Sequence, residues 1–390
     1  MMARPLGPVR MRRTNYVTVF IGVVLCTFII YFLSQSGSSS HTNTHRQRPS
    51  KPAPKSTVQH IRRDVQRFDL NKVTITDDPL ANKEHILILT PMVRFYDEYW
   101  ENLMKLNYPH ELITLGFILP KNKEGNAATS ALQAAVTKAQ KGPSKNRFRR
   151  IIIERQDFDP PLASQDEAER HKLHNQKERR AAMSKARNSL LFTTLGPDTS
   201  WVLWLDADIV ETPKTLIQDL ASHNKPLVVP NCFQRYTDDN GKLAERAYDF
   251  NSWQDSVTAQ ELGAKMGKDD LLLEGYAELA TYRTLMAYMD LDNKQDVSVE
   301  VDLDGVGGTA LMVRAEVHRD GAMFPPFPFY HLIETEGFAK MAKRLGYQAT
   351  GLPNYRVRLI FQPAVGSHAN PVHRYITTMS KQYISRPFPG

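Results

Sequence analysis

Two aspartates separated by one residue, Asp206 and Asp208, directly follow an apolar run at Trp201–Leu205. Carboxylates at positions i and i+2 point to the same side of an extended backbone. Hard divalent cations prefer oxygen ligands, and they also accept the oxygens of a diphosphate. A metal ion held there neutralises charge on a departing diphosphate. We therefore predict that Asp206 and Asp208 form a metal site, in which one carboxylate holds the metal and the other orders it or a ribose.

An isolated Asp-x-Asp pair is weak evidence, because such pairs also occur in solvated loops. Here the preceding strand is apolar throughout, and about four strand–helix units precede the pair. Phosphatases of the haloacid dehalogenase type use a related pattern, which Asp206–Val210 fits. Those phosphatases carry the motif on the first strand of the domain, so this class is a distant alternative.

Basic side chains occur on both sides of the expected nucleotide pocket. Arg94 lies four residues after Thr90, on the loop that follows the first predicted strand, where it could clamp a diphosphate or guanine. Four more crowd the helix before the Asp-x-Asp strand: Arg179, Arg180, Lys185 and Arg187. A solvated basic face is the simpler interpretation of that helix.

The elements that must position these residues alternate between strand and helix. Apolar runs predict strands, at 85–90, 111–119, 150–154, 201–205 and 227–230. Helical spacing predicts helices, at 98–106, 127–140, 164–195 and 335–345, and Thr212-Pro213 predicts a further helix start. Two more strands are expected within 297–317, around a glycine-rich turn. This alternation predicts an α/β domain with a mostly parallel sheet, which binds ligands at the carboxyl ends of its strands.

The first eighty residues are predicted to be a membrane-targeting segment and a stem rather than part of a folded domain. Residues 16–33 are apolar and uncharged, and arginines precede them, which predicts an uncleaved transmembrane signal anchor with residues 1–15 in the cytosol. A cleaved signal peptide is the alternative, but its apolar region is usually shorter. Residues 34–80 are rich in Ser, Thr, Pro and basic residues, which is typical of a flexible stem. We therefore expect a type II membrane protein with a lumenal domain at 81–360 and an unassigned tail at 361–390.

The net charge of +8 suggests acidic partners. The basic residues are spread over several segments, and neither a zinc-finger spacing nor an aromatic RNA-binding motif accompanies them. Nucleic acid is therefore not the expected partner. One of the two cysteines, Cys26, lies in the predicted anchor, so the folded part is expected to lack a disulfide with Cys232.

Several long motifs resemble one known family, the fungal Golgi mannan polymerase subunits of the Anp, Van and Mnn type, which are α-1,6-mannosyltransferases. They cover roughly residues 85–355 in the order of that family: ILILTPMVR at 86–94, ARNSL at 186–190, WVLWLDAD at 201–208, YDFNSW at 248–253, EGYAE at 274–278, DGVGG at 304–308, FPPFPFYHLIETEGF at 324–338 and GLPNY at 351–355. A match of this length is far more specific than a single short motif.

The resemblance implies a GT-A type nucleotide-sugar transferase domain, with GDP-mannose as donor and Mn²⁺ as cofactor. It also implies extension of the α-1,6-linked mannan backbone of N-glycans on cell-wall glycoproteins, in a complex with other mannan polymerase subunits in the Golgi membrane. It assigns the metal–diphosphate to Asp206 and Asp208 and the border of the nucleotide to Thr90, Arg94, Arg187 and Asn188. The catalytic candidates that it implies are Asp249, which would face the sugar or acceptor, and Glu274 and Asp304 near the transfer site.

One position departs from the family. Its members usually place a histidine four residues after the tyrosine of GLPxY as a further metal ligand, and this chain has Leu359 there. Resemblance is also lost in the tail, which is consistent with an altered gene end. A structural subunit that keeps the fold but reacts only with partners is therefore the alternative to an active mannosyltransferase.

Overall fold

The computed structural model describes residues 65–157, 173–238, 240–274, 279–289 and 295–362, together with Thr27. The chain divides into two units, Met1–Val65 and Gln66–Gly390, and the fold described below belongs to the second. The predicted anchor at 16–33, apart from Thr27, and the tail beyond 362 lie outside the described residues. Within the described part of the chain, no helix combines the length and apolarity needed to cross a bilayer.

The second unit is built around one mixed ten-stranded sheet. Its strands are β1 (His85–Pro91), β2 (Ile113–Leu119), β3 (Arg150–Arg155), β4 (Thr199–Leu205), β5 (Ile209–Glu211), β6 (Leu227–Thr237), β7 (Leu243–Ala247), β10 (Val301–Leu303), β11 (Ala310–Arg314) and β12 (Ala349–Gln362). A separate two-stranded sheet pairs β8 (Trp253–Gln254) with β9 (Thr284–Leu285). The main strand order is β3-β2-β1-β4-β11-β6-β12-β10, with β5 paired to β12 and β7 paired to β6.

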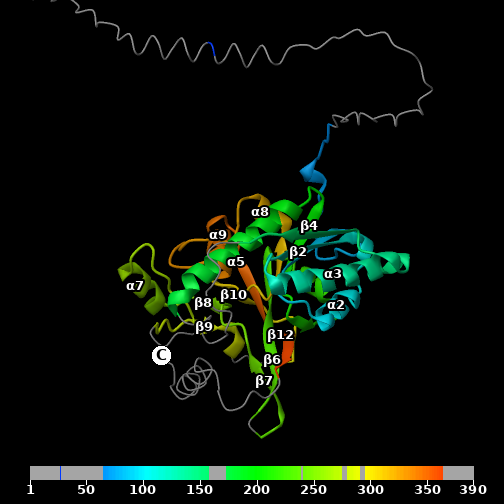
Figure 1. Cartoon of the computed structure of the whole chain (residues 1–390). Helices are drawn as coiled ribbons and strands as arrows, with labels where there is room; N and C mark the ends of the chain where they lie inside the picture. The colour runs from blue at the N-terminus through cyan, green and yellow to red at the C-terminus, as the bar shows by residue number, and fades with distance from the viewer. Residues whose placement is uncertain are drawn as a thin grey trace, which may run out of the picture. The chain divides into compact units, whose positions relative to one another are not determined.

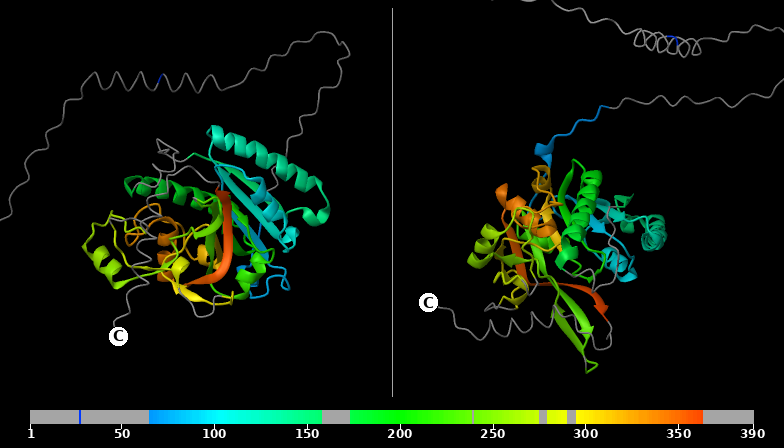
Figure 2. Two further views of the ribbon diagram at one scale, coloured as in Figure 1. Left: turned by 90° about the horizontal axis from the view of Figure 1, so that it is seen from below. Right: turned by 60° about the vertical axis from the view of Figure 1, so that its left-hand side comes forward.

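Helices cover both faces of the main sheet (Figures 1 and 2). They are α2 (Asp97–Met104), α3 (Lys123–Lys141), α5 (Leu173–Thr194), α6 (Leu216–Ser222), α7 (Val257–Lys265), α8 (Ala315–Arg319) and α9 (Glu334–Arg344). Short 3-10 turns occur at η1 (Leu70–Lys72), η2 (His110–Leu112), η3 (Ser144–Asn146) and η4 (Met286–Tyr288).

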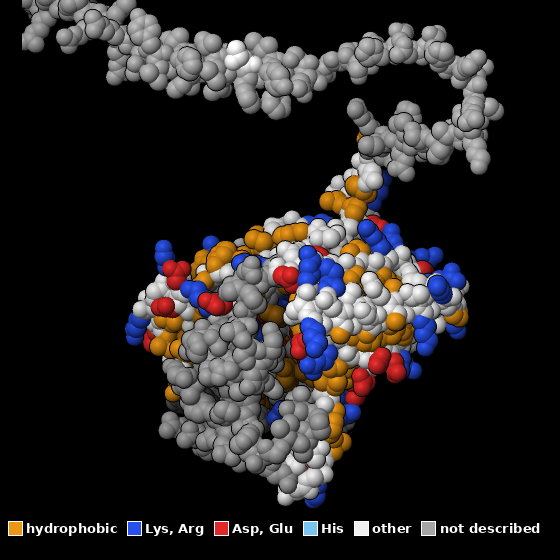
Figure 3. Space-filling view, viewed as in Figure 1, with side chains coloured by type: hydrophobic (Ala, Val, Ile, Leu, Met, Phe, Trp, Pro, Cys, Tyr) orange, Lys and Arg blue, Asp and Glu red, His pale blue; other side chains and the backbone are white. Residues whose placement is uncertain are grey.

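Alternation of side chains along the strands gives the sheet two apolar faces and therefore two cores. In β1, Ile86 and Ile88 join the core beneath α2, α3 and α6, whereas Leu87 and Leu89 join the core beneath α5, α8 and α9. Trp204 of β4 lies in the second core. Lys and Arg side chains are distributed over the surface that carries α2 and α3, with Asp and Glu among them (Figure 3).

The predicted alternation of elements is confirmed in the first half of the unit, where β1, β2, β3 and β4 are parallel. The prediction of a mostly parallel sheet is wrong for the second half. Strand β11 enters between β4 and β6 and runs antiparallel to both, and β7 folds back on β6 as a hairpin. A short turn such as the one between β6 and β7 permits only antiparallel pairing, because a parallel crossover needs a dozen or more residues.

The helix predicted to start at Thr212-Pro213 begins later, at Leu216. The hydroxyl and the backbone N–H of Thr212 both bond to the side-chain oxygen of Asn102 in α2, at 3.1 Å and 3.2 Å. Thr212 therefore fixes α2 to the chain after β5 and does not cap the helix.

Candidate functional site

The aspartate pair lies where the sequence predicts it, at the carboxyl end of the fully buried strand β4. The backbone N–H of Asp206 donates to Thr309 O at 2.9 Å, and Asp206 O accepts from Ile209 N at 3.1 Å. The carbonyl of Asp208 accepts from Ile360 N of β12 at 2.8 Å. A tight turn between β4 and β5 thus carries both aspartates, and the backbone of Asp208 is bonded to β12.

Arg187 of α5 connects Asp206 to helix α9. Its Nη2 donates to Asp206 Oδ1 at 2.9 Å and its Nε donates to Glu334 Oε1 at 3.3 Å. The guanidinium also lies 5.5 Å from the ring centroid of Trp204 and 5.6 Å from that of Phe324. The arginine side chain is 2% exposed and that of Asp206 is 24% exposed, so a buried cation supports a carboxylate that reaches solvent.

One donor of Arg187 is left over for a ligand. Its Nη1 is buried and has no hydrogen-bond partner among the described residues. Leaving a buried cationic donor unpaired is costly, and a planar guanidinium suits the oxygens of a phosphate. A role for Arg187 beside a diphosphate stays a prediction, and the unpaired Nη1 is the donor that it would use.

Burial raises the pKa of Asp206, which Arg187 opposes and the nearby carboxylate of Glu334 reinforces. A cation placed between Asp206 and Asp208 would offset the repulsion among these carboxylates. The donor set therefore fits a hard divalent ion whose remaining positions are filled by diphosphate oxygens or water. Among the described residues, no group of three or more His, Cys, Asp or Glu side chains is placed to hold a metal ion.

Thr90 is the penultimate residue of strand β1. Its hydroxyl is buried and lies 2.5 Å from the hydroxyl of Tyr99 in α2. Burial raises the pKa of Tyr99, and the charge of Asp206 adds to this effect. Arg94 lies on the following loop with an exposed side chain, and no described residue bonds to it. Thr90 and Arg94 thus lie at the strand end where the sequence predicts a nucleotide.

Asp249 lies on the loop between β7 and β8 and is 4% exposed. Its Oδ1 accepts from Asn251 N at 2.9 Å and its Oδ2 accepts from Ser252 Oγ at 3.1 Å. A Cβ on Gly307 would lie 1.7 Å from Asp249 Oδ2, so only glycine fits beside this carboxylate. Burial raises the pKa of Asp249 to about 6.

The structure places three other predicted residues in bonded positions. Asn188 bonds through both ends of its amide to the backbone of Phe324, at 2.7 Å and 2.9 Å. Glu274 accepts from Arg283 Nη1 at 2.8 Å, and burial raises its pKa.

Asp304 accepts from Lys343 Nζ at 2.5 Å and from Asp255 N at 2.8 Å. Burial opposes the effect of these two donors, which lower the pKa of Asp304. The geometry thus groups Asp206, Asp208 and Arg187 and gives Asn188, Glu274 and Asp304 partners within the protein.

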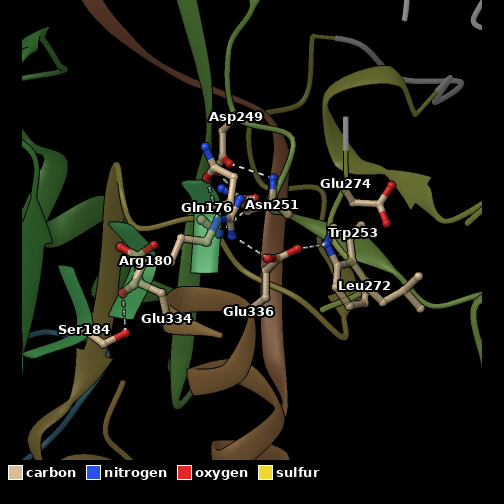
Figure 4. A network of polar contacts seen from close by, with 12 residues as sticks. Gln176, Arg180, Ser184, Asp249, Asn251, Trp253, Leu272, Glu274, Glu334 and Glu336 are labelled. Atoms are coloured by element: carbon tan, nitrogen blue, oxygen red, sulfur yellow. Dashed lines mark hydrogen bonds and ion pairs between the residues drawn. The ribbon is translucent and has the colours of Figure 1, made fainter. Parts of the chain in front are cut away.

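Sequence reasoning missed four residues that line this region: Arg180, Trp253, Glu334 and Glu336. Arg180 was assigned to a solvated basic face, but it is 7% exposed and its Nη1 lies 2.6 Å from Glu336 Oε2. The indole of Trp253 donates to the other oxygen of Glu336 at 2.9 Å (Figure 4). The sequence signal that could have identified the two acids is their place in the family motif at 324–338.

Leu359 is a core residue of β12. It is 3% exposed and lies opposite Ile209, the residue that follows Asp208. The position where the resemblance expects a third metal ligand is therefore next to the aspartate pair along the sheet, and an apolar side chain occupies it.

Sequence comparison identifies the class of protein. The family model described as Anp1 matches residues 64–328. The chain is 59% identical to mannan polymerase complex subunit mnn9 of Schizosaccharomyces pombe, over 74% of this chain and 84% of that protein. It is 50% identical to mannan polymerase complex subunit MNN9 of Candida albicans, over 86% of this chain and 92% of that protein. The chain belongs to the Anp1 family.

Comparison with solved structures gives weaker similarities. Mannosyltransferase PcManGT from Pyrobaculum calidifontis, in complex with GDP-Man and Mn²⁺, is 12% identical over 83% of this chain and 69% of that chain, with a TM-score of 0.38. GalNAc-T7 with UDP, GalNAc and Mn²⁺ is 11% identical over 77% of this chain and 50% of that chain, with a TM-score of 0.39. The family assignment rests on the sequence relatives.

Proposed function

We propose that this chain is a metal-dependent mannosyltransferase of the GT-A type and a subunit of a mannan polymerase complex. It transfers mannose from GDP-mannose to the α-1,6-linked mannan backbone of N-glycans on cell-wall glycoproteins. The names of the relatives support the assembly and the polymer. The observation that carries the proposal is the Asp206–Arg187 pair, in which a buried arginine keeps one unpaired donor beside the aspartates.

Each group has a separate task in this site. A Mn²⁺ ion bound by Asp206 and Asp208 would neutralise negative charge on the departing GDP. Arg187 binds a diphosphate oxygen through its free Nη1 and keeps Asp206 oriented through Nη2. Thr90 and Arg94 border the nucleotide at the end of β1. Preorganised charges of this kind stabilise a transition state because they need no reorganisation during the reaction.

Asp249 acts in its ionised form. Its carboxylate accepts a hydrogen bond from a sugar hydroxyl and stabilises positive charge that develops at the sugar ring. Since the pKa of Asp249 is raised to about 6, we expect the transfer rate to fall as the pH drops below about 6. Glu274 and Asp304 complete the acceptor side of the site in this proposal.

The place of action in this proposal is the Golgi lumen. Residues 16–33 anchor the chain as a single-pass type II membrane protein, and residues 34–80 tether the transferase domain as a stem. The uncharged apolar run and the arginines before it support this orientation.

The test uses the purified full-length chain in detergent, alone and together with co-expressed partner subunits. GDP-mannose, Mn²⁺ and a short α-1,6-mannoside are added, and elongation is followed with and without a chelator. We expect elongation that the chelator abolishes and that excess Mn²⁺ restores. Elongation that is insensitive to the chelator would contradict metal dependence.

A partner-dependent or non-catalytic subunit is the second candidate, and Leu359 favours it because a core leucine replaces a potential ligand. This candidate predicts that the isolated chain binds GDP but does not elongate the acceptor. Elongation that appears only with partners whose own aspartate pairs are intact would favour it.

A further inference from the structure

A buried set of charges, built around Arg180 and Glu336, lies next to the loop that carries Asp249 (Figure 4). Glu336 of α9 is 0% exposed, and both its carboxylate oxygens are bonded, to Arg180 Nη1 at 2.6 Å and to Trp253 Nε1 at 2.9 Å. The Arg180 side chain is 9% exposed. Glu336 and Arg180 therefore form an ion pair that is almost wholly removed from water.

This ion pair is poorly explained as a stabilising contact. Removing two charges from water carries a large desolvation cost, and replacing a buried ion pair by well-packed apolar side chains is often neutral or stabilising. The neighbouring Trp253 is likewise buried, at 1% exposure. The burial of Arg180 and Glu336 is better explained by a role in orienting neighbouring groups than by a role in stability.

The pair is connected to Asp249 by a short chain of hydrogen bonds. Arg180 Nη2 donates to Asn251 Oδ1 at 3.2 Å, and Asn251 N donates to Asp249 Oδ1 at 2.9 Å. On its other side, Ser252 Oγ donates to Asp249 Oδ2 and accepts from Gly307 N at 3.0 Å. The carboxylate is thus held between a loop that is bonded to α5 and the backbone of Gly307, which has no side chain to displace it.

A second ion pair parallels the first. Arg180 and Arg187 are seven residues apart, which places them on one face of α5, two turns from each other. Glu334 and Glu336 oppose them from the start of α9, and Glu334 has a φ of 57°, a left-handed conformation that non-glycine residues rarely adopt. Arg187 donates a hydrogen bond to Asp206, and in the same way Arg180 donates one to Asn251. The two helices therefore fix both halves of the site.

We propose that Arg180 and Glu336 are positioning residues for Asp249: they fix the loop that holds its carboxylate, and Glu336 supplies a negative charge behind it. This inference rests on the proposed function, in which ionised Asp249 faces the sugar.

The charges around Asp249 make the inference measurable. Glu336 from α9 and Asp206 from the end of β4 both raise the pKa of Asp249, after burial as the largest cause. The thiol of Cys232 in β6 also faces it and is itself disfavoured as a thiolate by the charge of Asp249. Arg180 from α5 acts on it through Asn251. Removal of the Glu336 charge therefore lowers the pKa of Asp249.

The experiment compares Glu336→Gln with the full-length wild-type chain in complex with its co-expressed partner subunits. The acidic limb of kcat/KM is expected to move to lower pH by about one unit, because a like charge has been removed. A purely structural defect lowers the rate at every pH and leaves the limb in place, and that result overturns the inference. If Glu336→Gln does not fold, Arg180→Gln/Glu336→Gln removes both charges and is expected to give a smaller shift in the same direction.

Glu84→Gln is the matched control. Glu84 is also a buried carboxylate that accepts an indole N–H, from Trp201 Nε1 at 2.8 Å, but it lies just before the amino end of β1. Its variant is expected to lower the melting temperature without moving the acidic limb. An equal shift of the limb in Glu84→Gln would overturn the inference.

A second readout needs no catalysis and so separates this inference from the proposed function. The substitution Asp249→Asn is made in the wild type and in E336Q. For each of the two, the gain in melting temperature that Asp249→Asn causes is measured as a function of pH. We expect the gain to begin at the same pH in both backgrounds, but in E336Q to be smaller and to reach its plateau at lower pH, because the folded-state pKa of Asp249 is lower there. Identical pH curves overturn the inference even if the protein transfers mannose, and a shifted curve supports it even if no transfer is found.

Discussion

The carboxylate of Asp249 is held by one backbone N–H and one hydroxyl, and burial raises its pKa from 3.8 to about 6. In the folded state the proton is therefore bound more tightly than in the unfolded state. Ionisation of Asp249 thus destabilises the fold progressively between about pH 4 and pH 6, and the full penalty applies above pH 6. A residue that weakens the fold in this way is typical of a functional site.

We accordingly expect Asp249→Asn to stabilise the protein at neutral pH while it abolishes transfer. The pKa difference corresponds to a gain of about 3 kcal/mol in the free energy of unfolding. A poor hydrogen bond between the new amide group and the Ser252 hydroxyl would reduce this gain. Chemical denaturation at pH 7.5 and at pH 4 measures the effect, which should vanish at the lower pH. A variant that is less stable than the wild type at pH 7.5 would show that Asp249 is a structural residue.

Substitution of Arg187 is a second test at the residue scale, because it shows whether this arginine contributes to nucleotide binding. Arg187→Lys keeps the charge but loses the planar fork that bonds Asp206 and Glu334 simultaneously. We expect the affinity for GDP in the presence of Mn²⁺ to fall about tenfold or more, as lost charge-assisted hydrogen bonds imply. Calorimetric titration measures this change.

Arg149→Lys provides the control for Arg187, because Arg149 forms a comparable pair with Asp198 at 2.7 Å on an exposed surface. It should leave GDP affinity unchanged. An equal loss of GDP affinity in the two variants would contradict the assignment of Arg187 to the nucleotide site.

At the scale of elements, the turn from β10 to β11 leaves room for the carboxylate of Asp249, because Gly307 has no side chain. A methyl group on Gly307 would lie 1.7 Å from Asp249 Oδ2, an approach that no rotation of the short aspartate side chain relieves without breaking its two hydrogen bonds. We expect Gly307→Ala to reduce transfer at least about a hundredfold, because a small displacement of a reacting group has an effect of that size.

Gly241 provides the comparison for Gly307. It lies in the turn between β6 and β7 with a φ of 73° and open space around its Cα, so Gly241→Ala should cost about 1 kcal/mol of stability and leave the rate unchanged. The transfer rate and the melting temperature of the two variants are measured together. Loss of activity in Gly241→Ala, or full activity in Gly307→Ala, would contradict this view of the turn.

Much of the nucleotide half could be predicted because its signals are local. Strand β4 is apolar along its length and ends in Asp206 and Asp208, so pattern and chemistry coincide. The second half depends on contacts between distant residues. No local signal shows that β11 enters the sheet antiparallel, or that Arg180 turns inward to meet Glu336 across 156 positions of the chain. Tertiary packing decides these features, and the arginine-rich helix shows how it overrides an apparently solvated pattern.

At the scale of the whole molecule, the two cores lie on opposite faces of one sheet, and the site forms where α5, α9 and the end of β4 meet. Arg187 and Asp206 belong to different elements, so the site exists only in the folded unit. Substitution of the aspartates should consequently affect ligand binding far more than folding, since the Asp206 side chain is 24% exposed and Asp208 is partly exposed.

The measurement that tests the central claim most directly compares the wild type with Asp206→Asn/Asp208→Asn in one preparation of the full-length chain with its partner subunits. Melting temperature, Mn²⁺-dependent binding of GDP-mannose and elongation of an α-1,6-mannoside are recorded for both. We predict a folded variant that has lost both the Mn²⁺-dependent binding and the elongation. A folded variant that elongates the acceptor at the wild-type rate would contradict the assignment of this site as the mannosyl-transfer centre.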